Sequence, residues 1–367
     1  MSKKKINNKP DWINLPEFAS DKSGGKIIFC SDEFFAPAKR VILHDPPIAQ
    51  KNKLTKNGVW MDGWESKRKR TEGHDWCILQ LPVACNIRGI EIDTAHFLGN
   101  YTPYVSIQGA NNPNLSNLPK YKSKMGNHIE GDDLKKAQEL TNHWKKIVKD
   151  TKLNAGYEKT RYKYITLNNS KYWTHLRINM LPDGGISRIR VYGVPDLRNI
   201  NKNKCINLTS MYNGARVIYF NDSFFSHVNN LLLPKKSINM HDGWETARKI
   251  HRPKTLKVNS NNMLTSYGKK WKDWCVILLA GSSTISEIEV DTTHFKGNTP
   301  ESFILEGCYN TNKNNKNKWT VIKERTKLKA NYNNRFKIKN DKIFTHLRFS
   351  IIPDGGVSRL RVKGYLL

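Results

Sequence analysis

Two short blocks of the 367-residue chain combine carboxylates with a tryptophan. In the first block, Asp62 and Glu65 stand three positions apart around Trp64, and Asp242 and Glu245 repeat this spacing in the second block. Carboxylates that lie near histidine and arginine can supply an acid, a base and a clamp for an anion. Both blocks are therefore candidate catalytic segments.

A run of basic residues follows the first block and leads to His74, which could transfer a proton. Arg68 in this run and Arg188 further along have forked guanidinium groups that could hold a carboxylate through two hydrogen bonds. Arg359 takes the place of Arg188 in the second half of the chain. The alternative to a catalytic role of this segment is a surface loop whose aspartate and arginine side chains pair with each other while Trp64 and Trp76 fill the core.

A histidine ends each of two matching strand-like segments, and an aspartate precedes each histidine by three positions. The pairs are Asp93 with His96 and Asp291 with His294. In a regular strand the two side chains of such a pair point to opposite faces, whereas a loop or bulge would change this. The alternative is a histidine that is held by backbone groups at a strand end.

These motifs recur in the same order in both halves, so the chain is a duplicated domain. We predict a first repeat at residues 18–197, a second repeat at 205–367, an N-terminal tail at 1–17 and a polar linker near 195–204. The DGWE blocks are 180 positions apart but the DWC blocks are 198 apart, so the second repeat has 18 extra residues near 251–267. Trp144 and Trp319 are 175 apart, which places 23 extra residues before Trp144 in the first repeat.

Period-two alternation in several matched blocks predicts half-buried strands, for example at residues 90–94 and 176–180. Each Pro-Asp-Gly-Gly turn is expected to join two strands into a hairpin. Many short strands with long loops indicate an all-β fold of two antiparallel sandwiches. The exception is a predicted helix face in the first insertion, formed by Leu134, Ala137, Leu140, Trp144 and Ile147.

The chain has 62 Lys and Arg against 32 Asp and Glu, a formal charge of +30. Such a charge suggests nucleic-acid binding, but lysine is scattered and accompanies asparagine in loop-like stretches such as 310–318, which favours a compositional bias instead. A positive field would still raise the encounter rate of a small anionic substrate.

Targeting and cysteine patterns favour a cytoplasmic protein. No run of about 18 apolar residues is present, which argues against a membrane-spanning helix, and the N-terminus does not resemble a secretory signal. The six cysteines show no CxxC motif and no zinc-type spacing, so we expect free buried thiols and no structural zinc.

Taken together, the motifs resemble the allantoicase family. The resemblance rests on SDEFFAP, MDGWES, KRKRT, GHDWC, IRGIEIDTAHFLGN, DGWET, IEVDTTHFKGN and the two PDGG endings, and it spans nearly the whole chain. It implies a tandem of jelly-roll β-sandwiches similar to galactose-binding domains. It also implies an oligomeric hydrolase of carbon–nitrogen bonds in linear amidines, which converts allantoate to ureidoglycolate and urea in purine degradation.

The resemblance leads to a set of expected site residues. We expect Asp62, Glu65 and His96 to share the acid, base and orienting roles, with His74 as a further proton-transfer candidate. The expected substrate ligands are Arg68, Arg188, Asn100 and Trp64. The corresponding residues of the second repeat are Asp242, Glu245, His294 and Arg359.

The first repeat is the preferred place for the site, because Trp271 and Lys272 replace the Gly-His pair that contains His74. No cofactor is required by the sequence. Its Asp, Glu and His residues could bind a divalent metal such as manganese, but no ligand spacing calls for one. Two other functions remain open: a non-catalytic jelly-roll that binds a ligand, and a degenerate allantoicase. We expect neither a membrane nor a nucleic-acid partner.

Overall fold

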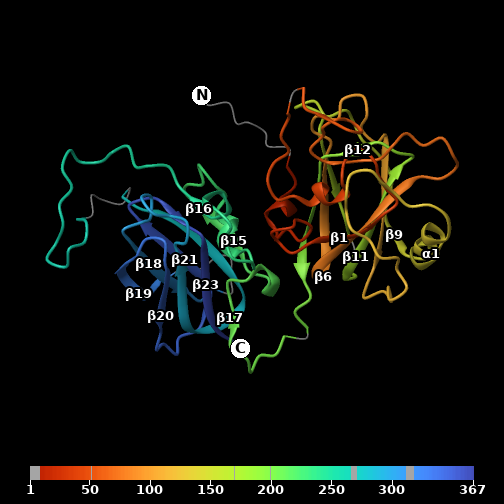
Figure 1. Ribbon diagram of the computed structural model, residues 1–367. Coiled ribbons are helices and arrows are strands. Elements are labelled where there is room, and N and C mark those ends of the chain that lie inside the picture. The colour runs from red at the N-terminus through yellow and green to blue at the C-terminus, as the bar shows by residue number, and fades with distance from the viewer. Residues whose placement is uncertain (1–8, 51, 169, 199, 266–270, 311–317) are drawn as a thin grey trace, which may run out of the picture. The chain divides into compact units, whose positions relative to one another are not determined.

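The computed structural model describes residues 9–50, 52–168, 170–198, 200–265, 271–310 and 318–367. Contacts within the chain divide it into two units, residues 1–196 and 197–367 (Figure 1). Each unit is mainly antiparallel β-structure, and the second unit has a large core of buried aliphatic and aromatic side chains. The expected all-β fold with two repeated sandwiches is confirmed.

The first unit contains thirteen strands, one α-helix and two short 3-10 helices among its described residues. In chain order they are η1 Asp11–Asn14, β1 Lys26–Cys30, β2 Asp32–Glu33, η2 Ala38–Ile42, β3 Leu54–Thr55, β4 Gly58–Val59, β5 Trp64–Glu65, β6 Asp75–Asp93, β7 Tyr104–Ala110, β8 Asn127–His128, α1 Gly131–Asn142, β9 Lys145–Lys152, β10 Tyr162–Thr166, β11 Trp173–Leu181, β12 Gly185–Ile186 and β13 Arg188–Pro195.

The 19-residue strand β6 organises this unit, because its two ends pair with different neighbours. Its first part, up to Gln80, pairs with β1 and β11, and β7 and β9 continue the sheet beyond β11. Its last part, from Cys85 to Asp93, pairs with β13 and β10. A sandwich thus forms around one strand that takes part in both of its layers.

The predicted hairpin across the Pro-Asp-Gly-Gly turn is wrong. Strand β11 pairs with the first part of β6 and β13 with its last part, while the short strand β12 pairs with β5. The turn therefore carries the chain from one layer to the other instead of folding it back. Gly184 in this turn has a φ of +123°, and a Cβ there would lie 2.7 Å from the Thr102 nitrogen, so glycine is required.

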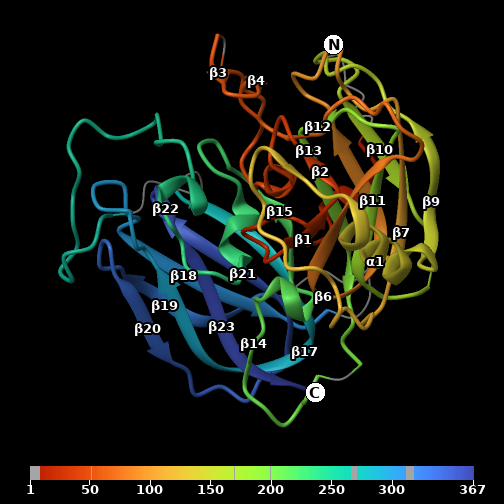
Figure 2. The same ribbon diagram turned by 45° about the vertical axis from the view of Figure 1, so that its right-hand side comes forward.

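The second unit repeats this arrangement around the 19-residue strand β17 (Figure 2). Its elements are β14 Ile206–Asn207, η3 Met211–Asn213, β15 Arg216–Phe220, η4 Val228–Leu232, η5 Met240–Asp242, β16 Trp244–Glu245, β17 Asp273–Asp291, β18 Ser302–Cys308, β19 Thr320–Lys327, β20 Asn333–Lys337, β21 Phe344–Ile352, β22 Gly356–Val357 and β23 Arg359–Leu366. Strand β17 pairs with β15 and β21 at one end and with β20 and β23 at the other.

The insertion of the first repeat covers one face of its sheet. Helix α1, next to β9 in Figure 1, and the preceding loop pack on Phe29 and Trp76. The predicted helix is confirmed up to Asn142 but wrong beyond it, because Ile147 lies on β9, which pairs with β7. In the second unit the residues that correspond to Phe29 and Cys30 are Tyr219 and Phe220, and both are exposed.

A buried carboxylate fastens this insertion to the sheet. Glu33 has no exposed surface and accepts five hydrogen bonds, of which Tyr121, Ser123 and the backbone N–H of Lys124 supply three at 2.6–2.8 Å. The others come from the Ala38 backbone and the Asn127 side chain. A carboxylate with this many donors is a strong anchor, and Ser223 replaces it in the second unit, where this insertion is missing.

All six cysteines are free, and five of them are buried as expected. Burial raises the pKa of the Cys30, Cys77 and Cys275 thiols. The exception is Cys205, which is exposed at the start of the second unit. Within the described residues, no helix is long and apolar enough to cross a membrane.

Candidate functional site

Glu65 is held at the edge of the first sandwich by short strand pairings on both sides. Its N–H donates to the Ala36 carbonyl at 3.1 Å, and its backbone pairs with Gly185 of β12. The next residue, Ser66, donates its N–H to the Gly184 carbonyl at 3.0 Å. The backbone around Glu65 is therefore fixed by two other parts of the chain, one at Ala36 and one at residues 184–185.

The side chain of Glu65 meets Asn100, and this contact joins two of the predicted site residues. Asn100 Nδ2 donates to Oε1 of Glu65 at 2.6 Å, while Oε2 accepts no hydrogen bond from the described chain. Glu65 is only 8% exposed. Burial raises the pKa of Glu65 to about 7, against the smaller opposite effect of the Asn100 hydrogen bond. Near neutral pH this carboxyl group can both donate and accept a proton.

Asp62 and Arg188 also meet, but as a buried ion pair. Arg188 Nη2 lies 2.8 Å from Oδ2 of Asp62, and both side chains are less than 10% exposed. The other guanidinium nitrogens donate to backbone carbonyls, including those of Asp62 and Asp45. Arg359 and Asp242 form the same buried pair in the second unit, at 3.1 Å. This arrangement gives both pairs a structural function, and a role of Arg188 or Asp62 toward a substrate stays a prediction.

His96 lies in a tight turn at the end of β6. It has a φ of +68°, and the Phe97 N–H donates to the Thr94 carbonyl across the turn at 3.0 Å. Its ring Nε2 lies 3.3 Å from the Pro47 carbonyl oxygen, and His294 makes the equivalent contact with Ser237 at 3.0 Å. These contacts match the interpretation of a histidine held by backbone groups.

Asp93, three positions before His96, does not pair with it. Its carboxylate instead receives two hydrogen bonds from Arg161, from Nε at 2.9 Å and from Nη2 at 2.5 Å. His74 also lies apart from the Glu65 carboxyl group: its Nε2 lies 3.2 Å from Oδ1 of Asn179 on β11, and burial lowers the pKa of its ring. A proton-transfer role of either histidine stays a prediction.

The remaining two predicted ligands have opposite surroundings. Trp64 is fully buried, and its Nε1 donates to the Asp32 carbonyl at 2.8 Å, so this ring belongs to the core and cannot touch a substrate in this structure. Arg68 is exposed and forms no hydrogen bond or ion pair with the described chain. Arg68 is therefore the predicted arginine that is free to bind an anion.

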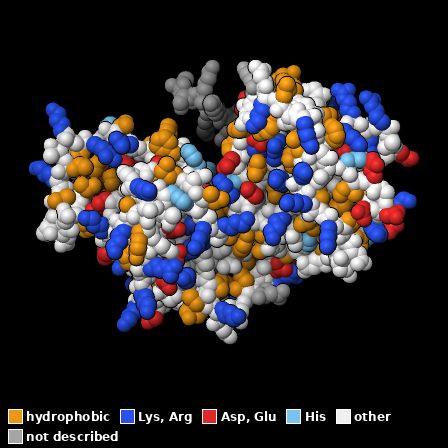
Figure 3. Space-filling model, in the orientation of Figure 1, with side chains coloured by type: hydrophobic (Ala, Val, Ile, Leu, Met, Phe, Trp, Pro, Cys, Tyr) orange, Lys and Arg blue, Asp and Glu red, His pale blue; other side chains and the backbone are white. Residues whose placement is uncertain are grey.

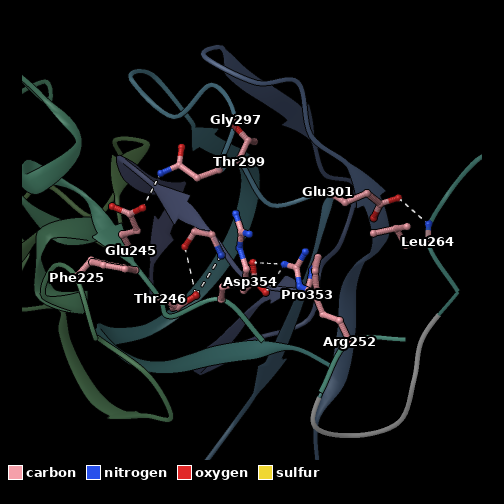
Figure 4. Close-up of a pocket in the computed structure, with 13 residues that line it drawn as sticks. Phe225, Glu245, Thr246, Arg252, Leu264, Gly297, Thr299, Glu301, Pro353 and Asp354 are labelled. Carbon is pink, nitrogen blue, oxygen red and sulfur yellow. Dashed lines mark hydrogen bonds and ion pairs between the residues drawn. The ribbon is translucent and has the colours of Figure 1, made fainter. Parts of the chain in front are cut away.

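The second unit has the same glutamate–asparagine contact at the edge of a cavity of about 490 Å³ (Figure 4). Asn298 Nδ2 donates to Oε1 of Glu245 at 2.5 Å. Arg248, which corresponds to Arg68, lines this cavity and is exposed. Three of the lining residues, Glu245, Arg248 and Asn298, therefore correspond to predicted site residues of the first repeat.

Sequence reasoning missed the aspartate of the Pro-Asp-Gly-Gly turns, which it treated as structural. Asp183 accepts the Lys69 N–H at 2.8 Å, and Asp354 accepts the Lys249 N–H at 2.7 Å. Asp354 also lines the second cavity. Its recurrence at the same place in both repeats was the available signal.

Among the residues that the structure describes, no group of three or more His, Cys, Asp or Glu side chains is placed to hold a metal ion. The polar groups that contact Glu65 and Ser66 are the Asn100 amide and backbone groups.

Comparison with known proteins decides the family. The "Allantoicase repeat" family model matches residues 16–196 and 206–367. The chain belongs to the allantoicase family. It is 34% identical over 369 residues to a "Probable allantoicase" of Acinetobacter baumannii (strain AYE), and the similarity covers 96% of each chain.

Solved allantoicase structures have the same fold. One described as "Structure of allantoicase" is 31% identical, with a TM-score of 0.73. The allantoicase from Saccharomyces cerevisiae is 32% identical, with a TM-score of 0.72. Both comparisons cover 96% of this chain and 93% of the other. In the present chain, each of the two repeats has a glutamate whose side chain accepts a hydrogen bond from an asparagine: Glu65 from Asn100 and Glu245 from Asn298.

Proposed function

We propose that this chain is an allantoicase, which hydrolyses allantoate to ureidoglycolate and urea during the degradation of allantoin. Its membership of the allantoicase family supports this activity. The observation that carries the mechanism is the Glu65–Asn100 contact, in which burial raises the pKa of a carboxyl group to about 7. We also propose that the enzyme acts in the cytoplasm as a homo-oligomer, which sedimentation analysis would test.

The reaction breaks one bond between the central carbon of allantoate and a ureido nitrogen. The departing nitrogen keeps the bonding electrons and gains a proton, which yields neutral urea. The oxygen of water forms the new bond to the central carbon and loses a proton, which yields ureidoglycolate. One proton must therefore be given and one taken, while the substrate carboxylate is unchanged.

Glu65 can perform both transfers in turn. In its neutral form it donates a proton to the departing nitrogen, and the resulting carboxylate then accepts a proton from the attacking water. Asn100 fixes Oε1, so that Oε2 is the oxygen that exchanges the proton. Arg68, which has no partner in the described chain, is the group that would hold the substrate carboxylate.

The proposal is tested by measuring urea release from allantoate by purified wild type and by Glu65→Gln, with and without EDTA. We expect wild type to turn over and Glu65→Gln to lose about 10²–10⁴-fold in kcat, the usual contribution of a positioned acid–base group. Glu72→Gln, an exposed glutamate of the same segment, is the matched control and should keep full activity.

Either of two results would contradict the proposed function or its mechanism. If folded wild type releases no urea under any condition, the protein is not an allantoicase. If Glu65→Gln is as active as Glu72→Gln, Glu65 does not transfer the proton. Loss of activity in EDTA that manganese restores would show that a metal takes part in the reaction.

A further inference from the structure

The insertion of the second repeat builds one wall of the cavity beside Glu245. Arg252 and Leu264 belong to the 18 extra residues, which have no counterpart in the first repeat, and both line the cavity. Leu264 is fastened by its N–H, which donates to Oε1 of Glu301 at 3.1 Å. Figure 4 shows Leu264 and Glu301 on one side of this space and Glu245 and Phe225 on the other.

Two guanidinium groups line this space and have N–H groups to spare. Nη2 of Arg252 is 2.8 Å and 3.0 Å from the two carboxylate oxygens of Asp354, and both residues line the cavity. Its Nε and Nη1 make no hydrogen bond with the described chain. The Arg248 side chain, which also lines the cavity, makes no hydrogen bond with any described residue. Free guanidinium N–H groups are suited to a carboxylate.

The opposite side of the cavity offers acceptors. Oε1 of Glu245 is taken by Asn298, but Oε2 of Glu245 and Oδ1 of Asn298 accept no hydrogen bond from the described residues. These oxygens are suited to N–H donors of a neutral amide-like group. The Phe225 ring, on the side of Glu245, and the Leu264 side chain, on the side of Glu301, add apolar surface to the cavity (Figure 4).

We propose that this cavity is a second ligand site, separate from Glu65, that binds a ureido-substituted carboxylate. The carboxylate of the ligand contacts Arg248 and Arg252, and the ureido N–H groups donate to Glu245 and Asn298. The choice of ligand class rests in part on the proposed function, because allantoate and ureidoglycolate both belong to it. The site itself rests on the cavity and on Arg252, which only the second repeat supplies.

The test counts bound ligand with ureidoacetate, a stable ureido carboxylate with no second ureido group to release. Equilibrium dialysis of the full chain against labelled ureidoacetate should give two molecules bound per chain at saturation. Arg252→Gln should weaken one of them about 10-fold or more, because a charged hydrogen-bond donor is lost. Arg335→Gln, an exposed arginine of the same unit outside the cavity, is the matched control and should leave both sites intact.

A second variant fills the cavity without disturbing the fold. A Cβ at Gly297 meets no atom within 4 Å, so Gly297→Phe can place a ring in the cavity without backbone strain. It should remove one bound ureidoacetate. One molecule bound to wild type, or two that persist in both variants, would overturn the inference.

Urea release from allantoate by the same wild-type preparation separates this inference from the proposed function. Two bound ureidoacetate molecules without turnover would overturn only the proposed function. Normal turnover with one bound molecule would overturn only the second site.

Discussion

Glu65 illustrates how a single side chain can favour chemistry at the expense of stability. Its neutral form suits a proton donor, and that form is populated at neutral pH because the carboxyl group is buried. The same burial makes the ionised form costly in the folded protein. A group tuned in this way should therefore lower the free energy of unfolding at the pH where the enzyme works.

This cost predicts a pH-dependent stabilisation by Glu65→Gln. Burial raises the pKa of Glu65 from 4.5 to about 7, so the folded chain binds this proton more tightly than the unfolded chain, and stability falls as pH rises between these values. Above pH 7 the full cost applies, about 3 kcal/mol from the size of the shift. Urea denaturation should show Glu65→Gln more stable than wild type at pH 8, with a much smaller gain at pH 5. If Glu65→Gln were stabilised equally at pH 5 and pH 8, the gain would not come from removing a buried charge. The control Glu72→Gln should not be stabilised at either pH.

The sequence showed which residues belong to the candidate site more readily than it showed which residues contact one another. The DGWE and Gly-Asn motifs identified Glu65 and Asn100, and the structure brings them together. Arg188 and Asp62 are 126 positions apart, and nothing in their local pattern shows that they pair with each other. Arg252 could not be recognised at all, because it lies in an insertion of a single repeat.

Strands show the same limit at the scale of elements. Alternating polarity correctly predicted strands in β6 and β11, since that pattern is local. Pairing depends on the whole sheet, and the turn after β11 leads into the two-residue strand β12, which pairs with β5. The expected hairpin failed for this reason. The insertions were correctly located because a duplicated chain provides its own internal comparison.

The Glu33 anchor predicts how the first insertion is held. Glu33→Gln replaces one acceptor oxygen by an N–H₂ group that faces donors, so we expect a loss of roughly 2–4 kcal/mol in the free energy of unfolding. Hydrogen exchange should rise first in residues 115–130, which supply four of the five donors. Glu139→Gln, on the exposed side of α1, is the control. Unchanged exchange in this loop would show that the apolar contacts to Phe29 and Trp76 hold it alone.

At the scale of the whole molecule, the outstanding property is the charge of +30. Lys and Arg side chains are spread over the face shown in Figure 3 and do not gather into a single stripe. On this face (Figure 3), the distribution does not outline a track for a phosphate backbone, whereas a broad positive field attracts any small anion.

The charge predicts a salt-dependent association step. Raising NaCl from about 20 to about 300 mM shortens the Debye length from roughly 20 Å to below 10 Å. We expect kcat/KM for allantoate to fall several-fold while kcat stays constant, because screening slows encounter and not chemistry. Sucrose at matched osmolarity should have no such effect. A parallel fall of kcat would show that salt acts on the site itself.

The distribution of the cysteines gives the protein an unequal sensitivity to thiol chemistry. Cys30 and Cys77, close to the anchored insertion, are buried and their thiols resist ionisation, so neither an oxidant nor an alkylating reagent can readily attack them in the folded state. Cys205 is the accessible thiol among the six. A maleimide dye would therefore attach at Cys205, which follows the linker between the two repeats in the sequence. The labelled protein would carry one optical reporter at a known position without any engineered residue.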